Sequence, residues 1–248
     1  MRPPAFWNDA GALQGRLLAP AGRLYALLSR PGRGRARRAP VPVVCIGNAV
    51  LGGAGKTPVA LAVAERLAAA GHRPHFLSRG YGGRERGPVR VDPAAHGASD
   101  VGDEPLLLAR AAPTWVARNR PAGARAAAEA GATVIVMDDG FQNGNLAKDT
   151  AILVADGAVG YGNGRVFPAG PLREPAEAAH ARADALVVVG RPRCALPNGL
   201  PRLEARLAPA PGSERLAGEA VFGFAGIGRP GKFAETLQEL GAQLVDFR

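Results

Sequence analysis

A lysine and a threonine that follow a glycine-rich turn carry the clearest chemical signal in this chain. Lys56 and Thr57 come directly after Gly52-Gly53-Ala54-Gly55, and an apolar run over Val43–Gly47 precedes the turn. Backbone N–H groups of such a turn close around phosphate oxygens, the lysine reaches the β- and γ-phosphates, and the threonine hydroxyl can ligate magnesium. The strict phosphate-loop pattern has a glycine where this chain has Val50. We predict a nucleotide-binding loop at these residues, with a chance glycine-rich turn as the alternative.

Two adjacent acids supply the carboxylates that a nucleotide site needs. Asp138 and Asp139 follow the apolar run Thr133–Met137. A buried parallel strand delivers its last side chains to the carboxyl edge of the sheet, where α/β proteins bind ligands. An acid at that place can hold the magnesium ion of Mg-ATP directly or through water. The alternative is a pair of solvated acids at the end of a strand.

The rest of the chain alternates strand and helix signals. Apolar runs predict further strands at Pro74–Ser78, Thr114–Ala117, Thr133–Met137, Ala151–Ala155 and Ala185–Val189. Alanine- and leucine-rich segments predict helices at Thr57–Ala70, Glu104–Ala111 and Pro121–Ala130. Because this alternation is typical of β-α-β units, we predict an α/β protein with a P-loop NTPase-like doubly wound parallel sheet.

The first forty residues differ from the rest in charge and pattern. They hold eight arginines against Asp9, a net +7, while the remaining residues account for +3 of the total +10. Their apolar residues recur at three- and four-residue steps and predict one stripe, made of Phe6, Trp7, Ala10, Leu13, Leu17, Ala21, Leu24, Tyr25 and Leu28. We expect Pro20 and Gly22 to bend or split this helix.

The same segment suits a membrane surface better than a membrane span. Arg16, Arg23 and Arg30 interrupt it too often for a span, which needs about 20 apolar residues. The cluster Arg33, Arg35, Arg37 and Arg38 follows the stripe. We therefore predict that the segment lies in an anionic membrane interface. A helix packed on the protein's own core and an organellar transit peptide are the alternatives.

Composition limits the other classes of function. The two cysteines, Cys45 and Cys194, are too few for a disulfide framework and fit a reducing compartment. No His or Cys residues have metal-ligand spacing. The basic charge comes without interleaved aromatic residues or a recognised nucleic-acid motif, so we predict no nucleic-acid partner.

Several segments together resemble one enzyme family. Besides the loop at 47–58, these are Ser78–Gly83, Gly102–Pro105, Asp138–Gln142 and Phe167–Pro175, with a later match at Gly223–Gly228. On these motifs the chain resembles the tetraacyldisaccharide 4'-kinases, the lipid A kinases, over nearly its whole length. It departs from the family at Val50, where threonine is usual, and at Asn143, where histidine is common.

The resemblance implies transfer of the γ-phosphate of ATP to the 4'-hydroxyl of tetraacyldisaccharide 1-phosphate, which gives lipid IVA. It implies that Mg²⁺ accompanies ATP as the cofactor. Lys56 and Thr57 would hold the phosphates and the metal, Asp138 and Asp139 would be the strand-end acids, and Glu104 would support the metal.

The resemblance also assigns the remaining site residues. Asp103 matches the aspartate that helps to deprotonate the sugar hydroxyl, a task that needs a positioned base. Arg120 and Arg173 match arginines that stabilise the phosphoryl charge. Gln142 would line the nucleotide site. Without the resemblance, we would interpret Asp103 and Glu104 as acids that favour a helix N-terminus.

The motifs and the composition suggest three parts. We predict a basic amphipathic membrane-interface segment at 1–40, a P-loop kinase domain at 41–212, and at 213–248 the start of a second, smaller and incomplete α/β domain. A proline-, arginine- and alanine-rich stretch, Pro192–Gly218, crosses between the last two. The family places such a protein peripherally at the cytoplasmic face of the bacterial inner membrane, where its partners are ATP, the lipid and the anionic surface.

A membrane-associated P-loop ATPase that acts as a switch, without a sugar acceptor, is the alternative function. The long loop Gly157–Pro175 and the Asp103-Glu104 pair count against it, because a switch needs no acceptor base. A purely structural interaction module fits less well still.

The family has an Asp-His-His motif after a strand that corresponds to the last residues of this chain. The sequence reaches Asp246-Phe247-Arg248 without it, and its histidines, His72, His75, His96 and His180, lie outside the matching segments. We therefore expect the chain to be a truncated form that binds Mg-ATP but transfers phosphate poorly, with its last thirty or so residues loosely held.

Overall fold

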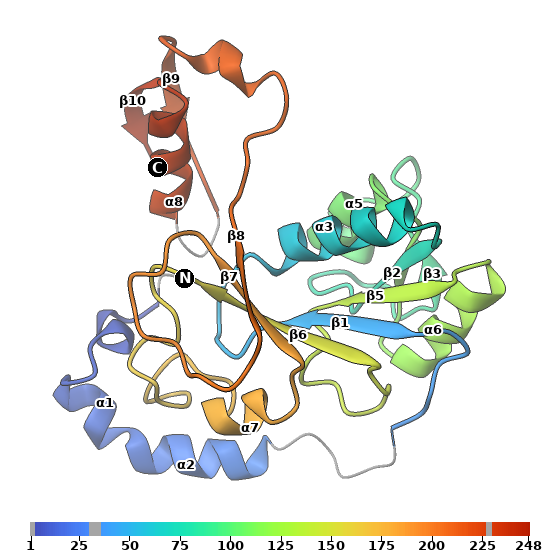
Figure 1. Cartoon of the computed structure of the whole chain (residues 1–248), viewed down its shortest axis with the longest axis horizontal. Helices are drawn as coiled ribbons and strands as arrows, with labels where there is room; N and C mark the ends of the chain where they lie inside the picture. The colour runs from blue at the N-terminus through green and yellow to red at the C-terminus, as the bar shows by residue number, and fades with distance from the viewer. Residues whose placement is uncertain (1–2, 30–35, 227–229) are drawn as a thin grey trace.

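The computed structural model describes residues 3–29, 36–226 and 230–248 and contains one large and one small sheet (Figure 1). The large sheet has eight strands in the order β3-β4-β2-β5-β1-β6-β7-β8. These strands are β1 (Val43–Gly47), β2 (Pro74–Ser78), β3 (Val89–Arg90), β4 (Thr114–Val116), β5 (Val134–Asp138), β6 (Thr150–Asp156), β7 (Ala185–Val189) and β8 (Arg202–Ala205). All neighbouring pairs are parallel except β3 and β4. The predicted doubly wound α/β fold is confirmed.

Helices cover both faces of this sheet (Figure 1). Helices α3 (Lys56–Ala69) and α5 (Asp103–Ala109) contact each other over one face, while α6 (Arg120–Glu129) and α7 (Ala176–His180) lie on the other. A short helix, α4 (Ala98–Val101), precedes α5. Since both faces are covered, the strands are buried almost continuously, as their apolar sequences require.

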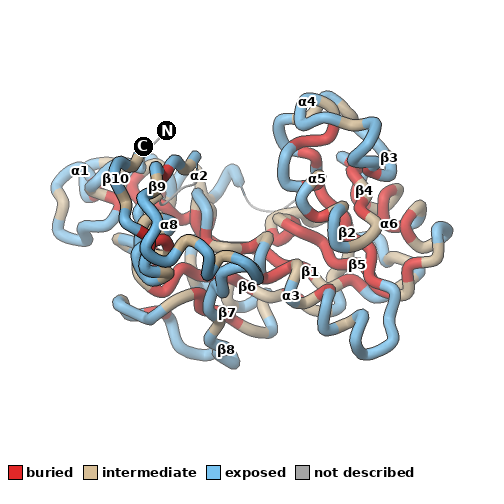
Figure 2. The backbone as a smooth tube through the Cα atoms, turned by 90° about the horizontal axis from the view of Figure 1, so that it is seen from above, coloured by how far each residue is buried: buried red, intermediate tan, exposed pale blue. Residues whose placement is uncertain are grey.

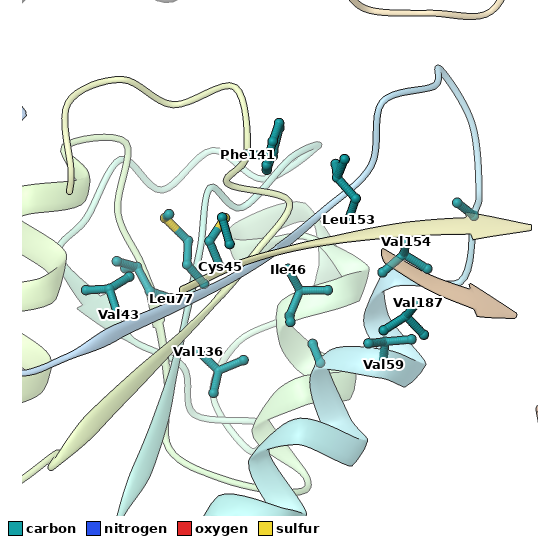
Figure 3. Packing of buried hydrophobic residues seen from close by; sticks show 14 of the residues in the cluster. Val43, Cys45, Ile46, Val59, Leu77, Val136, Phe141, Leu153, Val154 and Val187 are labelled. Carbon is teal, nitrogen blue, oxygen red and sulfur yellow. The ribbon is translucent and has the colours of Figure 1, made fainter. Parts of the chain in front are cut away.

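Strand β1 lies at the centre of the sheet and brings the loop after it to the middle of the carboxyl edge. It pairs with β5 through Val43 and Ile135 and with β6 through Val44 and Thr150. Figure 3 shows the core on its two sides, with Phe141 over one side and Val59 of α3 over the other. The strand that precedes the phosphate loop is therefore fixed by packing on both faces and by pairing on both edges.

The N-terminal segment forms three short helices rather than one long one. These are η1 (Ala5–Asn8), α1 (Leu13–Leu17) and α2 (Ala19–Leu28). Pro20 lies in the first turn of α2, where a missing N–H group is tolerated, so the helix is split before Pro20 as predicted, whereas Gly22 lies inside α2 and does not interrupt it. Among these helices and the others in the described residues, none has the length and apolar composition of a bilayer span. Of the predicted arginine cluster, Arg33 and Arg35 fall outside the described residues.

The prediction of one apolar stripe was wrong. Gly15 and Gly22 form the buried face of α1 and α2, because a Cβ atom at Gly22 would lie 2.7 Å from the carbonyl oxygen of Val166. Trp7 is buried as well, and its indole N–H donates to the carbonyl of Pro168 at 3.2 Å. The leucines of the stripe face solvent instead: Leu13, Leu17, Leu24 and Leu28 are exposed. Trp7 therefore packs against the protein, while the leucines lie on the outer surface of the segment.

The C-terminal residues form a small unit of strand β9 (Ala220–Gly223), helix α8 (Pro230–Glu239) and strand β10 (Gln243–Phe247), preceded by a short helix, η2 (Ser213–Leu216). The two strands pair in parallel, and α8 lies between them in the chain. Figure 2 shows mostly exposed backbone in this unit, in contrast to the buried backbone of β1, β2 and β5. An ion pair of 3.6 Å between Lys232 of α8 and Asp156 of β6 connects it to the large sheet. The proposed domain limits remain a prediction.

Five elements of the described residues were not predicted. Strand β8 and helix η2 lie inside the proline-rich stretch that we interpreted as a crossing segment, and β3, α4 and α7 are each five residues or shorter. Strand β8 is exposed along most of its length and carries charged residues, so its sequence lacks the apolar run of a buried strand. Short elements of this kind are fixed by their neighbours rather than by their own periodicity.

Candidate active site

The phosphate loop runs from the end of β1 to the start of α3. Gly55 has φ +86° and is the residue before the helix, while Gly52 has φ +116°. Both angles lie in the left-handed region that favours glycine. The loop therefore directs the first N–H groups of α3, a helix of 14 residues, at the space above the sheet. That geometry suits a bound phosphate group, because the helix dipole adds positive potential there.

Lys56 lies at the mouth of this loop and forms an ion pair with Asp139, the residue that follows β5. Its ammonium nitrogen is 3.6 Å from Oδ1 of Asp139, and its side chain is only 10% exposed. Oδ2 of Asp139 is 3.9 Å from Nη2 of Arg173. Asp139 itself has φ +50°, which an aspartate tolerates better than most residues. The structure thus brings three predicted site residues, from three distant segments, to one point.

Asp138 faces Thr57 on the first turn of α3. The threonine hydroxyl donates to Oδ2 of Asp138 at 3.1 Å. Burial raises the pKa of the Asp138 carboxyl to about 6, and the nearby charge of Glu104 adds to the rise, while Lys56 and the Thr57 hydrogen bond oppose it. Oδ1 of Asp138 is buried and has no hydrogen-bond partner among the described residues. This oxygen is therefore available to a metal ion or to a metal-bound water.

The donor set fits magnesium that arrives with a nucleotide. Among the described residues, no three His, Cys, Asp or Glu side chains form a cluster that could enclose a metal ion. Magnesium in nucleotide sites usually takes one or two protein oxygens and completes its shell with phosphates and water. Thr57 and the unpaired oxygen of Asp138 match that pattern, with Asp139 beside them.

The acids at the start of α5 face the same space. Gly102, with φ +89°, turns the chain so that Asp103 and Glu104 begin the helix. Partial burial raises the pKa of Glu104; the charges of Asp139 and Asp103 add to the rise, and those of Lys56 and Arg173 oppose it. These mutual effects mean that Glu104 lies within electrostatic range of the phosphate loop. Asp103 is exposed at the rim, where an incoming hydroxyl group could reach it.

Arg120 begins α6 and is almost completely buried. Its Nη1 atom donates to the carbonyl oxygen of Ala117 at 2.5 Å. Burial lowers its pKa to about 10; the positive charge of Arg79 contributes, and Asp139 opposes. Arg79 belongs to the matching segment Ser78–Gly83, which carried no predicted role. A second arginine therefore lies near Arg120, and this motif was the only sequence signal for it.

Gln142 makes its contacts with the protein itself. Its amide nitrogen donates to the backbone oxygen of Asn48 at 3.0 Å and to Oε1 of Glu174 at 3.2 Å. Both hydrogens of that nitrogen are thus used, and the predicted nucleotide contact remains a prediction. Asn143, which replaces the usual histidine, accepts N–H groups of Asn145 and Leu146 and so closes the following turn.

Comparison with known proteins decides the family. A sequence profile described as tetraacyldisaccharide-1-P 4'-kinase matches residues 14–248. The chain belongs to this family. It is 56% identical over 252 residues to the tetraacyldisaccharide 4'-kinase of Paramagnetospirillum magneticum, covering 99% of this chain and 77% of that protein. The identity to the corresponding kinase of Parvibaculum lavamentivorans is also 56%, over 259 residues, with 99% and 75% covered.

A solved structure of the family agrees with the fold. The LpxK protein of Aquifex aeolicus, crystallised in complex with ATP, superimposes with a TM-score of 0.76 at 28% identity. The superposition covers 95% of this chain and 81% of that one. The family assignment made from the phosphate loop and the later motifs is confirmed. The catalytic and binding roles that the family suggests for individual residues remain predictions for this chain.

Proposed function

We propose that this chain transfers the γ-phosphate of ATP to the 4'-hydroxyl of tetraacyldisaccharide 1-phosphate and so forms lipid IVA. The observation that supports it most is the meeting of Lys56, Asp139 and Arg173 above the N-terminus of α3. Two cations and a helix N-terminus converge there, which is what a transferring phosphoryl group requires. A switch ATPase would share the loop, but it would have no use for Asp103 and Glu104 at the rim.

In this proposal each residue acts on a different part of the reaction. The N–H groups of the loop and Lys56 bind the β- and γ-phosphates. Arg173 and Arg120 face the charge that develops on the equatorial oxygens. Asp103 accepts the proton of the 4'-hydroxyl group as that oxygen attacks phosphorus, and ADP leaves. Thr57, Asp138 and Asp139 would hold Mg²⁺, with Glu104 in support, and the ion would neutralise phosphate charge when bound.

The protein offers an apolar surface to the lipid acceptor close to the phosphate loop. A pocket of about 430 Å³ lies between the phosphate loop and the N-terminal segment, and its lining includes Trp7, Val50, Leu51 and Val159. The exposed leucines of α1 and α2 lie on the same N-terminal segment. We propose that these leucines and nearby arginines, including Arg37 and Arg38, rest on the anionic surface of the membrane at its cytoplasmic face.

The direct test is incubation of the chain with ATP, magnesium and tetraacyldisaccharide 1-phosphate in mixed micelles. We expect a bisphosphorylated lipid, and we expect Asp103→Asn to slow its formation by about 10²–10⁴, the usual value of a positioned base. Binding of Mg-ATP to the variant should be nearly unchanged. Hydrolysis of ATP without a phosphorylated lipid would favour the switch ATPase. Normal turnover in Asp103→Asn would leave that residue as a helix-start acid only.

A further inference from the structure

A buried carboxylate lies behind the phosphate loop, at the meeting point of three loops. Glu174 follows Arg173, and its side chain is buried. Its Oε1 atom accepts a hydrogen bond of 3.2 Å from the amide of Gln142, and that amide also donates to the backbone oxygen of Asn48 at 3.0 Å. One side-chain amide thus links the end of β1 to the segment that carries Arg173. The chemical steps proposed above assign no role to the side chain of Glu174 or to this amide nitrogen.

The other oxygen of Glu174 is paired with a cation from the far side of the same loop. Arg182, just after α7, forms an ion pair and hydrogen bond with Oε2 of Glu174. The guanidinium group also lies over the ring of Phe141, 4.8 Å from its centre. Phe141 packs so closely on β1 that a Cβ atom at Gly47 would lie 2.3 Å from its own Cβ. The ion pair is therefore attached to the central strand through an aromatic ring.

The residues of this group flank the charged residues of the site. Phe141 and Gln142 follow Asp139 after one glycine, and Glu174 follows Arg173 directly. The Arg173 segment also runs along the start of the phosphate loop, with its N–H donating to the oxygen of Ala49 at 2.8 Å and its Nε to the oxygen of Val50 at 3.1 Å. A shift of this group would therefore displace Asp139 and Arg173 relative to Lys56.

The negative charge of Glu174 matters as well as its shape. Lys148 lies in the same region, where its ammonium group donates to the carbonyl of Asn143 at 2.6 Å. Burial lowers the pKa of Lys148; the charge of Arg182 lowers it further and that of Glu174 opposes this. Without the carboxylate, Arg182 would lose its ion-pair partner, and the charge of Glu174 would no longer oppose the effect of Arg182 on Lys148.

We propose that Glu174, together with Gln142 and Arg182, is a positioning unit that sets Arg173 and Asp139 against Lys56 for phosphoryl transfer. None of the three touches the phosphate in this assignment, and each acts through a neighbour. The role rests on the proposed kinase function, because it names how that site is held in register. The alternative is a purely structural bracket that stabilises the fold without affecting the rate.

Three variants separate the two roles in the full chain. Glu174→Gln keeps the shape and the hydrogen bond from Gln142 but removes the charge opposite Arg182. Arg182→Lys keeps a charge but loses the flat contact with Phe141, and Arg182→Met loses both. Arg84→Met is the matched control, because Arg84 forms a surface ion pair of 2.6 Å with Asp100 and its side chain is 76% exposed.

We expect Glu174→Gln and Arg182→Met to lower kcat by roughly 10–100-fold, since small misplacements of reacting groups have effects of this size. The KM for Mg-ATP should change less than about threefold, and Arg182→Lys should recover part of the rate. Gln142→Ala combined with Glu174→Gln should lose little more than the worse single variant, because the two residues act as one unit. Arg84→Met should match the parent chain.

A second measurement does not depend on the lipid acceptor. Mg-ADP with aluminium fluoride resembles the phosphoryl group in the transition state, whereas Mg-ATP resembles the ground state. We expect Glu174→Gln to weaken binding of the first complex about tenfold more than binding of the second. If the parent chain fails to phosphorylate the lipid, the proposed substrate is wrong, and this ratio still tests the positioning. An unchanged kcat and an unchanged ratio, with only a lower Tm, would show a structural bracket and overturn the inference.

Discussion

The phosphate-binding edge of the sheet and the N-terminal helices use glycine in opposite ways. At the edge, Gly52 and Gly55 adopt left-handed angles and leave the backbone N–H groups open to a ligand. In α1 and α2, Gly15 and Gly22 are buried against the loop at 163–169, and they let two backbones come close. The first pair of glycines makes room for a small molecule, and the second makes room for the protein itself.

The burial of large side chains also differs between the two regions, and in each it is the opposite of what polarity alone would predict. Lys56 and Arg120 are charged yet nearly buried at the edge, because each has polar partners. Leu17 and Leu28 are apolar yet 70% and 78% exposed on the N-terminal helices. The comparison teaches that a helix contacts its own protein through its smallest residues here, while its leucines remain for another surface.

The largest expected effect is at the phosphate loop. Lys56→Ala should lower the transfer rate by roughly 10²–10³ or more, because a preorganised cation at the transferring phosphate is lost. The chain has two other lysines, Lys148 and Lys232, and both make their own contacts elsewhere. Titration calorimetry should also show weaker ATP binding. Unchanged ATP affinity in the variant would remove Lys56 from the site.

The next effect tests the glycine contact of the N-terminal helices. Gly22→Val should destabilise the chain by about 1–3 kcal/mol, because the new side chain meets the backbone oxygen of Val166. Ala21→Val, at an exposed position of the same helix, is the matched control and should change stability by less than about 0.5 kcal/mol. Equal thermal unfolding curves for the two variants would show that the glycine face makes no close contact in solution.

The third effect concerns Asp138 at the carboxyl edge of the sheet, where a change that abolishes magnesium binding should raise the stability of the fold. In the folded chain the pKa of Asp138 is raised from 3.8 to about 6, so the folded state binds more protons between these values. Stability should therefore fall as pH rises from 3.8 towards 6, and the penalty should be complete above 6. Asp138→Asn removes it and should stabilise the chain above pH 6 by up to about 3 kcal/mol, while magnesium-dependent transfer is lost.

Chemical denaturation of both proteins across this pH range measures the effect. The stability difference should shrink as the pH is lowered from 6 to 3.8. A variant that is less stable than the parent chain above pH 6 would mean that the carboxylate is better solvated or better paired than its burial suggests.

The smallest effect on stability is expected at the exposed leucines. Leu17→Ser with Leu24→Ser should change the free energy of unfolding by less than about 0.5 kcal/mol per residue, since neither side chain is buried. Flotation with anionic vesicles should nevertheless fall clearly, because the apolar face of the segment is lost. Normal flotation with lower stability would reverse the interpretation of this surface.

The sequence predicted the strands that consist of a continuous apolar run. Strands β2 and β7 have the limits predicted for them, β4 is one residue shorter at its end, and β5 and β6 each differ by one residue at both ends. The reason is that these strands are buried on both faces, so most of their residues are apolar and form a continuous run. The phosphate loop was equally readable, because left-handed angles demand glycine at Gly52 and Gly55.

Other features depend on partners far away in the chain. The edge strand β8 has no apolar run, and its place follows from pairing with β7. The exposed face of α1 and α2 could not be read from the spacing of its leucines, because an apolar stripe does not say what covers it. Gly15 and Leu17 lie about 200° apart on a helix, so the buried glycines were the missing signal.

The contacts of Glu174 could not be predicted for the same reason. Its motif was recognised, but its burial between Gln142 and Arg182 depends on how three loops meet. Likewise, the hydrogen bonds of Gln142 turn inward to the backbone of Asn48. A polar residue in a motif can serve the ligand or the scaffold, and only coordinates separate the two.

The central place of β1 in the sheet also bears on how the protein is made. Its two neighbours are β5 and β6, so the strand that carries the phosphate loop has no partner until residues up to Asp138 have left the ribosome, and its second partner follows only with residues up to Asp156. Pairings between distant segments form slowly, because loop closure comes before any gain from contact. Arg173, the arginine that pairs with Asp139 at the loop, is synthesised later still. A nascent chain therefore cannot bind nucleotide until most of its length has been synthesised. Binding of ATP can stabilise the sheet only after these strands have paired.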